Sequence, residues 1–146
     1  RITFEQISPV QNHEQNLHVL RYSTRATRIG EENSFHEELG YWSWEPATQE
    51  VMRSFLIPRG IALIAGGKAE KNAREFHLQA TNGSCTFGIC VNPFLDREFK
   101  ILSYEMTLRM IDKDSFSYEQ DTVLQLPGKK EPFHHTDSNT LRRVKQ

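Results

Sequence analysis

The chain has 146 residues, a formal net charge of −1, and 18 basic against 19 acidic side chains. This length allows one domain with a sizeable core, and a balanced charge without a Lys/Arg-rich block argues against a nucleic-acid partner. The longest purely apolar run is IALIA at 61–65, whereas a membrane helix needs about 20 residues. We therefore expect a soluble single domain over 1–146 with no membrane partner.

The two cysteines, Cys85 and Cys90, are too few for a disulfide framework. We interpret them as free, partly buried thiols in a reducing compartment and expect a cytoplasmic protein. No signal peptide is visible, but the chain starts at Arg1 without a methionine and runs at once into strand-like residues. We expect that residues upstream of Arg1 are missing.

Apolar and polar side chains alternate along most of the chain, which predicts β-strands with one dry face and one wet face. The predicted strands cover residues 2–7, 17–28, 35–44, 51–57, 61–63, 76–78, 102–110 and 116–126. Turn residues separate them, as at Pro58-Arg59-Gly60 and Asn82-Gly83. The segment 92–98, with Pro93 near its start, predicts a single helical turn.

Short, regularly spaced strands with tight connections predict an all-β antiparallel meander. Sequential hairpins favour a lipocalin-like or fatty-acid-binding-protein-like β-barrel over a Greek-key sandwich, which needs long crossovers. A barrel of about eight or more strands has room for one small ligand, so we expect a central cavity.

Residue patterns for covalent or metal chemistry are sparse. No Gly-x-Ser-x-Gly occurs, and the cysteines in CTFGIC have the small apolar neighbours of core thiols. None of the six histidines shows zinc-finger spacing with a cysteine, so a zinc site would need ligands from separate strands. Ala65-Gly66-Gly67 is followed by no helix pattern and indicates a tight turn or a close backbone approach. No catalytic residue is assigned.

Two adjacent histidines, His134 and His135, stand in the closing segment EPFHHTDSNTLRRV. On a regular strand at most one of them points inward. His135 shares its parity with Phe133 and Leu141, the bulkier apolar set, which favours His135 as the inward one. A bulge near 137–139 would reverse the register beyond it. An exposed polar pair is the other interpretation.

Longer segments carry a family resemblance that extends from about Ile2 to Val144. They are SFHEELGYWSWEPATQEVMRSFLIPRGIALIAGG, FGICVNPF, SYEQDTVL and PFHHTDSNTLRRV. The sequence resembles the nitrobindin family, heme-binding β-barrels that include the C-terminal domain of a THAP protein, and it is most similar to bacterial members. Family members usually begin with a Gly-x-Trp strand, so we expect the first strand to be missing here.

The resemblance implies heme b as the cofactor, with His135 as the axial ligand of the iron. His134 is the alternative cofactor-binding histidine if the strand has the opposite register. The family spacing, counted back from Val144, falls on Thr136, and a one-residue insertion near 137–139 would restore His135. Three apolar side chains are expected against the porphyrin: Met106, Leu108 and Leu124.

The resemblance also implies nitric oxide binding and the isomerisation of peroxynitrite to nitrate at ferric heme. An alternative is a non-catalytic carrier of a fatty acid or another small apolar molecule, with an inward arginine at its headgroup. The arginines considered are Arg21, Arg25, Arg53 and Arg109. A third possibility is a barrel filled by its own side chains, and in each case Trp42 and Trp44 would form core or cavity wall. The oligomeric state stays open.

Overall fold

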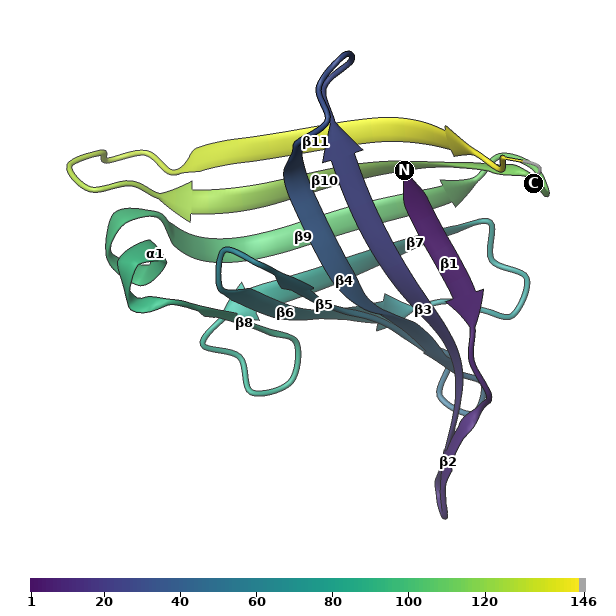
Figure 1. Ribbon diagram of the computed structural model, residues 1–146. Coiled ribbons are helices and arrows are strands. Elements are labelled where there is room, and N and C mark those ends of the chain that lie inside the picture. The colour runs from purple at the N-terminus through teal and green to yellow at the C-terminus, as the bar shows by residue number, and fades with distance from the viewer. Residues whose placement is uncertain (145–146) are drawn as a thin grey trace.

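A computed structural model describes residues 1–144 of the chain (Figure 1). It contains 11 strands and one short helix. In chain order these are β1 Ile2–Gln6, β2 Val10–Asn12, β3 Gln15–Thr27, β4 Ser34–Glu45, β5 Glu50–Ile57, β6 Ile61–Lys68, β7 Glu75–Asn82, β8 Gly88–Val91, α1 Pro93–Glu98, β9 Lys100–Met110, β10 Ser115–Gln125 and β11 Phe133–Arg142. Within 1–144 no helix combines the length and apolar character needed to cross a bilayer.

All strands belong to one curled sheet in the order β1-β3-β4-β5-β6-β8-β7-β9-β10-β11, while β2 pairs with β3 alone. This is the predicted antiparallel meander, and in Figure 1 β3 and β4 run steeply across the direction of β9 and β10. No ladder joins β1 to β11 among the described residues, so the barrel is open along this seam. The two edge strands therefore bound the opening.

The strand β8 breaks the simple meander. It lies between β6 and β7, antiparallel to β6 and parallel to β7. Further along, β6 and β7 meet directly at the pair Gly66↔Gln79. A Cβ on Gly67 would lie 1.9 Å from the His77 carbonyl oxygen, and one on Gly66 would run into the Phe87 ring. The glycine pair thus permits the close backbone approach that the sequence indicated.

The core lies on the inner face of the sheet. Its buried cluster joins strands from both layers and consists of Tyr22, Val51, Phe55, Leu63, Ala65, Leu78, Ala80, Tyr104, Met106 and Leu108. Aromatic contacts link the layers further, because the Trp42 and Phe76 rings are 6.1 Å apart and the Phe4 and Phe116 rings are 6.2 Å apart. The second contact connects β1 to β10 beside the open seam.

The predicted helical turn is present as α1. The Asn92 side chain accepts hydrogen bonds from the backbone N–H groups of Phe94 at 2.9 Å and Leu95 at 3.0 Å, and Leu95 is buried. This is the N-cap geometry that starts a helix, with proline at the first helical position. Figure 1 shows α1 at the end of the barrel away from the chain termini.

The interpretation of the cysteines as buried core thiols is wrong. Both Cys85 and Cys90 are free, and both are exposed. Cys85 lies in the loop between β7 and β8. On β8, Cys90 alternates with Ile89, and Ile89 is the one that packs against the core. The apolar neighbours of the cysteines in the sequence did not show that both thiols would face solvent.

Candidate functional site

The inner face of the sheet bounds a cavity of about 1280 Å³ that is open to solvent. Side chains of both layers line it, together with the loop at Ala69–Ala73 after β6. Its apolar wall includes Ile2, Phe4, Leu20, Trp42, Phe76, Met106, Leu108, Met110 and Phe116. The predicted central cavity is therefore present, and Trp42 and Trp44 both form part of its wall.

The two neighbouring histidines on β11 point to opposite sides. His135 lines the cavity, opposite Thr122 of β10. His134 lies on the outer face, where its Nδ1 is 2.6 Å from the Asp121 carboxylate. Within residues 1–144 no hydrogen bond or ion pair occupies the His135 ring, which remains solvent-accessible on the edge strand. Its nitrogens are available to a ligand in the cavity.

The ladder between β10 and β11 is continuous from Phe133 to Arg142. No bulge occurs at 137–139 in this ladder, and Thr136 takes the opposite strand parity to His135. The alternation that favoured His135 as the inward histidine therefore runs unbroken along the strand.

The predicted apolar residues divide into two groups. Met106 and Leu108 of β9 line the cavity and belong to the buried core. Leu124 is not among the described residues that line it. A register shift after Val123 pairs Leu124 with Ile101, at the opposite end of the β9–β10 ladder from Met110. Leu124 also lies four residues beyond Gln120, the partner of Met106, so its place along β10 separates it from the other two.

A buried ion pair lies in the middle of the barrel. Arg53 of β5 and Glu38 of β4 are 8% and 7% exposed, and the Arg53 Nη2 donates to Glu38 Oε1. The Tyr22 hydroxyl donates to the same carboxylate oxygen and accepts from Arg53 Nε at 3.0 Å. The guanidinium also lies over the Phe55 ring, 4.6 Å from its centroid. Three elements of one layer thus fix the position of this cation.

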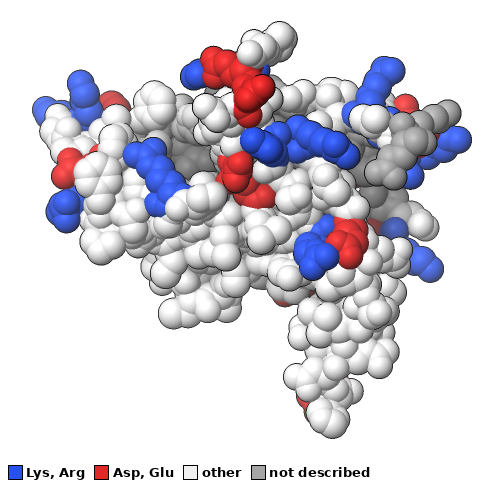
Figure 2. Space-filling view, in the orientation of Figure 1, with Lys and Arg blue, Asp and Glu red and all other residues white. Residues whose placement is uncertain are grey.

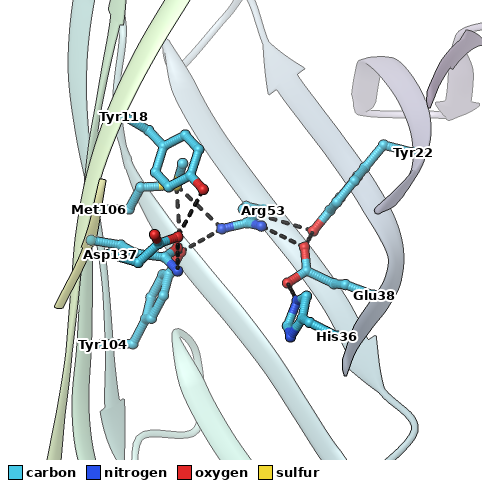
Figure 3. A network of polar contacts seen from close by, with 9 residues as sticks. Tyr22, His36, Glu38, Arg53, Tyr104, Met106, Tyr118 and Asp137 are labelled. Carbon is cyan, nitrogen blue, oxygen red and sulfur yellow. Dashed lines mark hydrogen bonds and ion pairs between the residues drawn. The ribbon is translucent and has the colours of Figure 1, made fainter. Parts of the chain in front are cut away.

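The same arginine connects the two layers of the barrel. Its Nη1 donates to the Tyr104 hydroxyl on β9, and this hydroxyl donates to Gln120 Oε1 at 3.1 Å. The Gln120 amide approaches Asp137 Oδ2 of β11 at 3.4 Å, and the Tyr118 hydroxyl donates to that oxygen at 2.7 Å. Figure 3 shows Arg53 between the two groups of side chains.

The pKa directions agree with this arrangement. Burial raises the pKa of Tyr104 to about 12, against the opposing effect of Arg53, so its hydroxyl stays protonated at neutral pH. Burial alone would raise the pKa of Glu38, but His36, Arg53 and Tyr22 together hold it below the ordinary 4.5. Glu38 therefore carries its negative charge beside the arginine cation.

Of the four arginines considered for a ligand headgroup, Arg53 is the buried one. The other three form ion pairs between exposed side chains: Arg21 with Glu5, Arg25 with Glu37 and Arg109 with Glu75. Figure 2 shows basic groups beside acidic ones on the visible face, without a large area of one sign. The inward arginine is already bound by Glu38, Tyr22 and Tyr104.

The polar network itself was not expected from the sequence, although a signal existed. Arg53 shares its strand parity with Val51 and Phe55, and Glu38 shares its parity with Trp42. A basic and an acidic residue at inward positions of successive strands indicate a buried ion pair. Among residues 1–144 no three His, Cys, Asp or Glu side chains converge as they would in a metal site.

The family model for the THAP4-like, heme-binding beta-barrel domain matches residues 1–143. The chain belongs to this family. The match confirms the resemblance to heme-binding β-barrels drawn from the sequence. The crystal structure of Rv2717c from M. tuberculosis is similar, with a TM-score of 0.60 and 19% sequence identity over 89% of this chain and 80% of that one. This likeness supports the fold, and no curated protein matches the chain.

The residues around the cavity fit a heme. The cavity exceeds the roughly 300–1,000 Å³ of ordinary small-molecule sites and has a largely apolar wall. His135 presents an imidazole without a competing partner among the described residues, and a neutral imidazole is a common ligand of heme iron. Two basic side chains, Lys71 and Arg143, also line the cavity and suit a cofactor that carries carboxylates.

Proposed function

We propose that this protein binds heme b in the barrel cavity, with His135 as the axial ligand of the iron. The observation that carries the proposal is the opposite orientation of the two histidines. His134 is bound to Asp121 on the outer face, whereas His135 lines an apolar cavity with its ring free among residues 1–144. His134, the second histidine considered for the site, is assigned no contact with the cofactor.

The finer proposal is that the heme protein acts on nitric oxide or peroxynitrite. Bound ferric heme would supply an iron centre at which a small nitrogen oxide coordinates and peroxynitrite rearranges to nitrate. The chain contributes a nitrogen ligand from His135 and an apolar wall from residues such as Trp42 and Phe116. No described side chain is assigned to proton transfer, so the chemistry would belong to the cofactor.

Titration of hemin into the apoprotein tests the binding proposal. We expect a saturable Soret band with one hemin per chain. Stopped-flow mixing of the loaded protein with peroxynitrite should then give faster decay and a higher nitrate yield than the apoprotein. A linear, non-saturable absorbance change would reject heme binding. A saturable band with unchanged nitrate yield would reject only the isomerase activity.

A fatty-acid carrier remains the second candidate, because the apolar cavity would accept an alkyl chain. The buried Arg53 guanidinium argues against a fatty-acid carrier. Arg53 already donates to Glu38, Tyr22 and Tyr104, so a fatty-acid carboxylate would have to displace a buried carboxylate. Native mass spectrometry that finds a co-purified lipid, together with no hemin response, would support the carrier instead.

A further inference from the structure

We propose that Tyr118 and Asp137 are positioning residues that hold β11 so that His135 faces the cavity. This inference rests on the proposed heme site. The starting observation is that β11 is an edge strand, hydrogen-bonded to β10 alone. All of its residues except Leu141 are exposed. A strand with one neighbour and little burial opens locally more easily than a central strand.

Asp137 is well placed to restrain this edge. It follows His135 by two residues in a continuous ladder, so both side chains lie on the cavity face of β11. Its Oδ2 accepts a hydrogen bond of 2.7 Å from the Tyr118 hydroxyl of β10, and the Gln120 amide lies 3.4 Å away. These contacts therefore hold the cavity face of β11 against β10, two residues from His135.

The restraint extends beyond the neighbouring strand. Gln120 also accepts from the Tyr104 hydroxyl, which in turn accepts from the buried Arg53. Asp137 is thus joined through side chains to β9 and to β5 in the opposite layer (Figure 3). Since the guanidinium is fixed by Glu38, the network ends in a rigid part of the core.

Such an arrangement matters for an axial ligand because the orientation of the imidazole sets the strength of its bond to the metal. Loss of a residue hydrogen-bonded to a metal ligand typically lowers metal affinity about 10–100-fold, and a residue that acts through the strand should lie at the lower end of that range. Burial, with the hydrogen bond to Asp137, raises the pKa of Tyr118, so its hydroxyl remains a donor at neutral pH. The restraint is therefore present under physiological conditions.

The test compares hemin affinity in Tyr118→Phe, Asp137→Ala and Asp137→Asn. Tyr41→Phe is the matched control, since it removes the hydroxyl from an exposed tyrosine on β4. We expect hemin binding about 10-fold weaker in Tyr118→Phe and Asp137→Ala, a smaller loss in Asp137→Asn, which keeps an acceptor, and no change in the control.

A second readout reports the iron–imidazole bond itself. In the ferrous nitrosyl form, electron paramagnetic resonance distinguishes iron with an axial imidazole from five-coordinate iron. Tyr118→Phe and Asp137→Ala should raise the five-coordinate fraction above that of wild type. In Asp137→Asn, which keeps an acceptor, this fraction should be closer to the wild-type value than in Asp137→Ala. If wild type binds hemin and both Tyr118→Phe and Asp137→Ala match it in hemin affinity and in the five-coordinate fraction, the positioning role alone is overturned. Wild type without a Soret band would overturn the heme proposal and this inference together.

Discussion

Arg53 of β5 and Glu38 of β4 form a buried ion pair inside the barrel. Arg53 pairs with Trp42 in the β4–β5 ladder, and Glu38 lies four residues before Trp42 on β4, on the same face of the sheet. The carboxylate therefore meets the guanidinium in the interior. Removing one member would leave an uncompensated buried charge, which is much more costly than an exposed one.

We expect Glu38→Gln to lower the free energy of unfolding by about 3–5 kcal/mol. Arg53→Met should do the same, and the double variant Arg53→Met/Glu38→Leu should lose less than the sum of the two single changes, because neither charge is then left alone. Urea unfolding followed by tryptophan fluorescence measures all three.

Glu37→Gln is the matched control for Glu38→Gln. The two glutamates are adjacent on β4, but Glu37 is exposed and lies 3.7 Å from the exposed Arg25. Its replacement should change the unfolding free energy by about 0.5 kcal/mol or less. Equal losses at both positions would contradict the assignment of Glu38 to the buried pair.

Stability should fall in acid through Glu38. Its folded pKa is held below the ordinary 4.5, so its contribution is present above that value and is lost as pH falls through the folded pKa. Unfolding free energies measured between neutral pH and pH 3 should show a steeper decline for wild type than for Glu38→Gln. A Glu38→Gln profile parallel to that of wild type would be evidence against the depressed pKa.

The network also predicts how the cavity treats carboxylates. Because Arg53 is already bound by Glu38, Tyr22 and Tyr104, Arg53→Met should leave the affinity of the apoprotein for oleate relative to oleyl alcohol unchanged, as measured by displacement of an environment-sensitive apolar dye. A marked preference for oleate that disappears in Arg53→Met would instead identify Arg53 as a headgroup site and would favour the carrier.

Gly67→Ala tests the close approach of β6 to β7. The new methyl group would lie 1.9 Å from a backbone oxygen of His77, which cannot rotate away. We expect a loss of about 1–3 kcal/mol in the unfolding free energy. As a comparison, Gly83→Ala replaces a loop glycine with open space around it, although its φ of +80° adds backbone strain. Similar stability of Gly67→Ala and wild type would show that the strands can separate without penalty.

Most of the fold followed from local patterning. Alternation along Leu102–Met110 or Phe116–Leu126 predicts a strand because each side chain responds to one face of its own sheet. Pro93 after Asn92 similarly located α1. The insertion of β8 between β6 and β7 could not be predicted, since a run of four residues carries little periodicity and its place depends on partners far along the chain.

The candidate site was predicted only in part, because several of its contacts also depend on partners far along the chain. Parity alone favoured His135, and the unbroken β10–β11 register agrees with it. Leu124 lies near the far end of β10, opposite Ile101, and strand alternation alone does not show how far along a strand the cavity extends. The meeting of Arg53 with Glu38 depends on the register between β4 and β5, which is a property of the assembled sheet and of neither strand by itself.

Hemin titration of His135→Ala and His134→Ala tests the central claim most directly. The two variants remove neighbouring imidazoles from opposite faces of one strand, and the bond lost in His134→Ala is an exposed contact to Asp121. We predict that His135→Ala abolishes or shifts the saturable Soret band, whereas His134→Ala leaves it at the wild-type position. A normal band in His135→Ala, or its loss in His134→Ala alone, would contradict the account.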